Sequence, residues 1–101
     1  MITRAIEPAL FTALRVGFEA GIQGDAPPIS ALQLGQIRSA LAAGVSAARR
    51  GRPILMVLES TADLYALSDC FAVGGEDHPQ VTEAQWDAIN ELLDKAASAG
   101  D

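Results

Sequence analysis

Two segments of the chain combine helical hydrophobic spacing with a helix start signal. Ser30 and Gln33 form a capping box, which satisfies free amides in the first turn of a helix. Apolar residues follow at steps of three and four, at Leu34, Ile37, Leu41, Val45 and Ala48. Thr82 and Gln85 repeat the box before a seam of Trp86, Ile89, Leu93 and Ala96. The pattern predicts one helix from Ser30 to about Gly51, and another that starts at Thr82.

The segment from Glu7 to Gly21 fits two periods. Its large apolar residues recur every four positions, at Leu10, Leu14, Phe18 and Ile22, which forms a helical stripe. The same segment also alternates as an edge strand would, with Thr12, Leu14, Val16 and Phe18 on one side. Pro8 is well placed for the first turn of a helix, and we expect the helix. Gly17 and Gly21 would then let another helix approach closely.

The continuous apolar run Ile54–Leu58 also allows two interpretations. One is a long helix from Pro53 to Gly74, with a face made of Val57, Thr61, Leu64, Leu67 and Phe71. The other is a buried strand over 54–58, followed by a shorter helix that Ser60 or Thr61 caps. We expect the long helix. The strand would require a second strand to satisfy its backbone, and the fold would become α+β.

These elements predict an all-α fold, a small bundle of about four helices in one domain that spans residues 1–101. The alternative is an α+β fold with a short strand at 54–58. The length of 101 residues supports a single core, but aromatic residues make up only 5% of the chain and the core is therefore thin. A thin core gains from a second copy that covers part of its surface, so we expect a homodimer.

Charge is distributed unevenly along the chain. Residues 1–50 carry a net charge of +2, and residues 51–101 carry −8, which together give the overall −6. A strongly acidic half repels phosphate backbones, so we expect no nucleic acid partner. The same asymmetry would steer a basic protein toward the chain, or let two copies meet head to tail.

The sequence also bears on location. It contains no apolar stretch of the roughly 20 residues that a spanning helix needs, so we expect no membrane association. Arg4, Glu7 and Arg15 interrupt any secretory signal. The single cysteine, Cys70, excludes an internal disulfide and fits a reducing compartment. These features predict a cytoplasmic protein, and the use of arginine over lysine, with abundant alanine, points to a bacterial source.

Side chains that carry chemistry are few. His78 is the only histidine and Cys70 the only cysteine, which are too few ligands for an ordinary zinc site. The glycines form neither a Walker pattern nor a dinucleotide-binding fingerprint. Arg49, Arg50 and Arg52 form the only basic cluster, and we expect them to complement a helix C-terminus. We therefore expect no enzyme activity, no cofactor and no metal.

A functional hypothesis follows from the apolar surface. In a helix, residues 54–58 would be apolar all round and would need cover on more than one side. We therefore expect a small regulatory or inhibitory protein that binds a protein partner through an exposed hydrophobic helical face within residues 54–67. The expected interface residues are Leu55, Leu58, Ala62, Tyr65, Phe71 and Trp86. The alternatives are an accessory subunit of a larger assembly, and a small enzyme that uses Cys70 or acidic residues.

Overall fold

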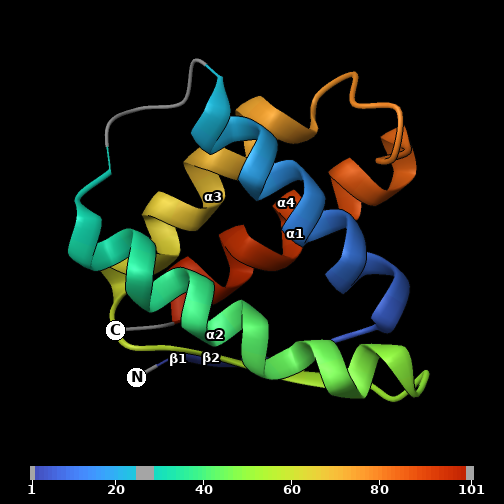
Figure 1. Ribbon diagram of the computed structural model, residues 1–101, viewed down its shortest axis with the longest axis horizontal. Helices are drawn as coiled ribbons and strands as arrows, with labels where there is room; N and C mark the ends of the chain where they lie inside the picture. The colour runs from blue at the N-terminus through green and yellow to red at the C-terminus, as the bar shows by residue number, and fades with distance from the viewer. Residues whose placement is uncertain (1, 25–28, 100–101) are drawn as a thin grey trace.

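The computed structural model describes residues 2–24 and 29–99. Over this part, the chain forms a mostly helical structure with four helices and a two-stranded sheet (Figure 1). The elements in chain order are β1 (Ile2–Ile6), α1 (Pro8–Gln23), α2 (Ala31–Arg49), β2 (Ile54–Leu58), α3 (Thr61–Gly75) and α4 (Glu83–Ala99). The expected number of helices is thus confirmed, but the all-α class is not.

The region 54–58 is a strand, and the prediction of a long helix there is wrong. β2 pairs antiparallel with β1, with Ile2 opposite Leu58 and Ile6 opposite Ile54. Burial along β2 alternates strictly, because Ile54, Met56 and Leu58 face the core while the two residues between them face outward. The α+β alternative therefore describes this region, and Ser60 caps the shorter helix that follows by accepting a hydrogen bond from the Asp63 amide at 3.2 Å.

The partner strand lies at the N-terminus. The segment 12–18, which could also have formed an edge strand, belongs to α1, and this confirms the helix expected there. β1 instead buries Ile2 and Ile6 on the same side of the sheet as Met56. Arg4 interrupts this alternation, since it stands at an inner position but remains half-exposed. Because of this charged residue, β1 lacks the regular alternation of apolar and polar residues that would have predicted a strand.

Glycines set the distance between α1 and α3. A Cβ added at Gly74 would overlap the carbonyl oxygen of Gly17 and the amide nitrogen of Gly21, and one added at Gly21 would overlap the carbonyl oxygen of Cys70. The two backbones therefore touch at this crossing, where only glycine leaves enough space. The close approach expected at Gly17 and Gly21 is confirmed, and its partner is α3.

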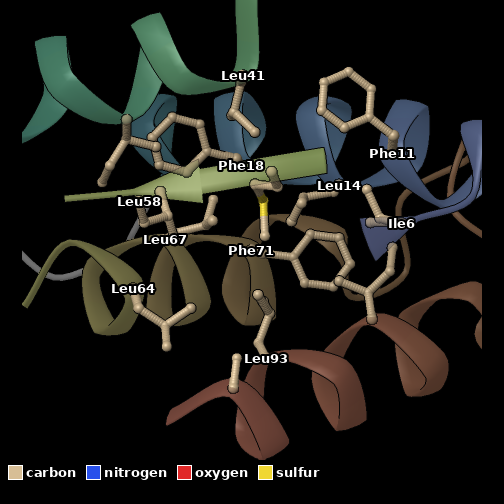
Figure 2. Close-up of a cluster of buried hydrophobic side chains, with 14 of the residues drawn as sticks. Ile6, Phe11, Leu14, Phe18, Leu41, Leu58, Leu64, Leu67, Phe71 and Leu93 are labelled. Carbon is tan, nitrogen blue, oxygen red and sulfur yellow. The ribbon is translucent and has the colours of Figure 1, made fainter. Parts of the chain in front are cut away.

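The buried apolar side chains form one cluster to which all six elements contribute. Phe11, Leu14 and Phe18 from α1 and Leu67 and Phe71 from α3 belong to this cluster, with α4 and its Leu93 below them (Figure 2). The sheet lies at the lower edge of Figure 1, with α2 running alongside it. Only the inner side of the sheet faces this cluster.

The helix start signals appear as expected. Ser30 accepts a hydrogen bond from the Gln33 amide at 3.1 Å. At α4, Thr82 accepts from the Gln85 amide at 3.1 Å, and the Gln85 side chain accepts from the Thr82 amide at 3.0 Å, which completes the capping box.

Candidate protein-binding surface

The structure divides the six expected interface residues. Leu55 and Tyr65 are exposed by 65% and 54% of their surface, and Ala62 is also exposed. Leu58 and Phe71 are buried in the core, and Trp86 is half-buried. The structure therefore does not bring the six residues together on one surface.

The three covered residues have structural roles. Leu58 points inward from β2, and Phe71 lies against Gly17 at the crossing of α1 and α3 (Figure 2). The Trp86 indole donates a hydrogen bond to the Ala72 carbonyl at 3.2 Å, which ties α4 to α3. Leu58 and Phe71 consequently present no surface to a partner in this fold, in contrast to their expected role.

The outward side of the sheet is apolar and uncovered. We call the side chains of Thr3, Ala5, Leu55 and Val57 the outer sheet face. The pairing register places Thr3 opposite Val57 and Ala5 opposite Leu55. All four are exposed, and none carries a charge. Because the core contacts only the inner side, no part of the chain within 2–24 and 29–99 covers this face.

A groove continues the outer sheet face toward α2. It has a volume of about 630 Å³, and we call it the α2–β2 groove. It is lined by Ala31, Leu32, Gly35, Gln36, Ser39, Ala40, Val57 and Glu59. Leu32 is exposed by 72% and Val57 by 36%, while most of the lining side chains on α2 are small. The groove is thus shallow, largely apolar and open to the approach of another chain.

Leu32 and Val57 are exposed large apolar residues of this surface that sequence reasoning missed, and Leu32 left a signal in the sequence. Leu32 lies two positions before Leu34, and therefore out of phase with the stripe that turns Ile37 and Leu41 into the core. Its position relative to that stripe predicts that Leu32 faces solvent. That signal was present in the sequence.

Opposite charges stand at the two ends of β2. Arg52 lies two residues before the strand, and Glu59 follows its last residue. Both are exposed. Within 2–24 and 29–99, the ion pairs are Arg38 with Glu19 at 2.9 Å and Lys95 with Glu91 at 2.9 Å. Arg52 and Glu59 therefore take part in neither of these pairs, and their charges are open to an approaching molecule.

The second hollow of chemical interest is an acidic one between α3 and α4. It has a volume of about 430 Å³ and includes Glu76, Asp77, His78, Glu83 and Trp86. His78 accepts a hydrogen bond from the Gln80 amide through Nδ1 at 3.1 Å, so this nitrogen serves the turn. Among the described residues, no three His, Cys, Asp or Glu side chains are arranged to hold a metal ion. The hollow offers no defined ligand set.

Cys70 lies in the core rather than in a cleft. Burial raises the pKa of its thiol, and the Asp69 carboxylate raises it further. A nucleophilic cysteine needs the thiolate at neutral pH, and this environment disfavours it. The geometry therefore argues against the version of a small enzyme that uses Cys70.

We expect Cys70 to be protected from alkylation in the folded protein. Its reaction with iodoacetamide at neutral pH should be about 100-fold slower, or more, than in urea, because the thiol reacts only after local or global opening. Because the pKa of the Cys70 thiol is raised in the folded protein, the stability that the protonated thiol contributes is lost as the pH rises through the folded-state pKa. Equal labelling rates in the folded and unfolded protein would contradict this burial.

Among the residues that the structure describes, none of the helices has the length and apolar character needed to cross a membrane. No known protein family, curated protein or solved structure matches the chain. The molecule is a small helical domain with a two-stranded sheet. Its outer sheet face and the adjoining α2–β2 groove are largely apolar and open.

Proposed function

We propose that this chain is a small non-enzymatic regulatory or inhibitory protein that binds a protein partner. Its binding surface consists of the outer sheet face and the α2–β2 groove. The observation that carries the proposal is the exposure of Leu32, Leu55 and Val57 on adjoining parts of this surface. Adjoining exposed apolar side chains with a polar rim are typical of a protein-binding site.

The energetics favour a protein as the ligand. Burial of a fully exposed leucine contributes about 1.5 to 3 kcal/mol, and Leu32 and Leu55, which are 72% and 65% exposed, would each supply a large part of this if a partner covered them. The small side chains of Ala31, Gly35 and Ser39 let a partner's backbone or large side chains come close to α2. Since the groove is open rather than enclosed, it suits the side of another protein better than a small molecule.

The charged side chain of the groove indicates the partner's complementary chemistry. Among the residues that the structure describes, Glu59 is the charged residue that lines the groove, and no basic residue lines it. A partner segment that is apolar and carries one arginine or lysine would satisfy both features. The arginine would pair with Glu59 at the rim while the apolar side chains cover Leu32 and Val57.

The test compares two exposed apolar residues that differ in location. We expect L55D to lose the protein that the wild type captures from the cells in which it occurs naturally, because a carboxylate on the outer sheet face opposes burial. V73D is the matched control, since Val73 is also an exposed apolar residue but lies on α3. A photo-reactive amino acid at position 55 should cross-link the same captured protein.

Both variants should keep the circular dichroism spectrum of the wild type, and its melting temperature at low protein concentration where a dimer does not contribute, because both side chains are exposed. The proposal would be overturned if L55D captured the same proteins as V73D and the wild type. A captured protein that is present at fixed stoichiometry under all growth conditions would instead identify the chain as an accessory subunit.

A further inference from the structure

We infer that a second copy of this chain occupies the outer sheet face, in a two-fold symmetric dimer held by reciprocal Arg52–Glu59 ion pairs. This inference rests on the proposed function for its binding surface, and it names a second copy of the chain as the occupant there. The order of charges along β2 and the composition of the face between them support this dimer.

The strand carries a positive charge before it and a negative charge after it. Arg52 precedes Ile54, the first residue of β2, and Glu59 follows Leu58, the last. When two such strands lie antiparallel, the positive end of each meets the negative end of the other. Two contacts between Arg52 of one copy and Glu59 of the other result. A parallel arrangement would place like charges together and is disfavoured.

The residues between these charges match under the same symmetry. A two-fold axis near Met56 places Leu55 of each copy against Val57 of the other, and Ala5 and Thr3 fill the margins. A strand rises about 3.3 Å per residue, so Arg52 and Glu59 are about 23 Å apart, beyond the apolar centre on each side. The sheets would pack face to face about 10 Å apart, a distance that an arginine and a glutamate side chain span together.

The desolvation cost of this arrangement is small. The four side chains of the outer sheet face are uncharged, so no charge is buried at the centre. Arg52 and Glu59 stay at the rim, where they set orientation and partner choice more than affinity. Because the interface is isologous, assembly stops at two copies. A head-to-tail contact between the basic and acidic halves of the chain would instead continue into larger assemblies.

The test exchanges the two charges one at a time. R52E and E59R should each dissociate into monomers at concentrations where the wild type is a dimer, with affinity reduced about tenfold or more, because both contacts then join like charges. An equimolar mixture of R52E and E59R should form a heterodimer. There, the introduced glutamate meets the introduced arginine, and native Arg52 meets native Glu59. Native mass spectrometry resolves the heterodimer from either homodimer.

The controls carry the same change in charge elsewhere. Arg15 lies on α1 and Asp87 on α4, and both residues are exposed. The variants R15E and D87R should therefore remain dimers. L55D should be a monomer. The inference is overturned if the wild type is a monomer at all concentrations, if it forms assemblies larger than two, if R52E and E59R dimerise as the wild type does, or if their mixture stays monomeric.

Failure here and failure of the proposed function give different results. A monomeric wild type whose L55D variant loses a captured protein would remove only the dimer. If the dimer shows the predicted charge behaviour but no other protein is captured in a way that depends on Leu55, the proposed regulation of a different protein is wrong and the dimer stands.

Discussion

Replacing Gly74 with alanine is expected to destabilise the protein by about 3 to 5 kcal/mol, a large part of the stability of a small domain. The added methyl group would overlap backbone atoms of Gly17 and Gly21. Backbone in a helix cannot rotate aside as a side chain does, so α1 and α3 must move apart. That movement would loosen the packing of Phe18 and Phe71. Urea denaturation followed by circular dichroism measures the loss.

Gly35 provides the control for this substitution. It lies in α2, exposed, and a Cβ at this position would have no neighbour within 4 Å. G35A should therefore stabilise the protein by about 0.5 to 1 kcal/mol, since alanine lowers the entropy cost of forming the helix. If G74A were as stable as the wild type, the backbones of α1 and α3 would not be in contact.

Local signals explain why α2 and α4 could be predicted. Each capping box involves a side chain and an amide only three residues apart, as at Thr82 and Gln85. Such a contact depends on no other part of the chain. The apolar stripes that follow have a period that only a helix satisfies, so these two helices could be predicted without knowledge of tertiary contacts.

The sheet could not be predicted in the same way, because its cause is non-local. Ile54 pairs with Ile6, which is 48 residues earlier in the chain. Five consecutive apolar residues contain no period, so they fit a helix and a strand equally well. The discriminating feature was Ser60, whose cap on α3 stops any helix from continuing back into 54–58.

The error at 54–58 carried over to the candidate site. Leu55, Leu58, Ala62 and Tyr65 are spaced by three and four positions, and so would share one face of a continuous helix. The strand changes the period at this point, which turns Leu58 inward while Leu55 stays outward. Leu55 thus survives as a surface residue. The sequence could indicate that the region has too much apolar surface, but only the pairing with β1 decides which residues are left uncovered.

We expect alanine at Leu58 and at Leu55 to have very different effects on stability. Leu58 is buried, so L58A should cost about 2 to 5 kcal/mol through lost burial and a residual cavity. Leu55 is exposed, and L55A should change the free energy of unfolding by about 0.5 kcal/mol or less. Thermal and urea denaturation of the two variants at low protein concentration, where a dimer does not contribute, measure both values.

The comparison tests more than the register of one strand. If Leu55 contributes nothing to the stability of the single chain, stability does not explain why a large apolar side chain is exposed to water at this position. Leu55 then remains available for binding, as the proposed function requires. A loss in L55A similar to that in L58A would mean that the chain itself covers the outer sheet face. Neither a second copy nor another protein would then find an apolar surface there.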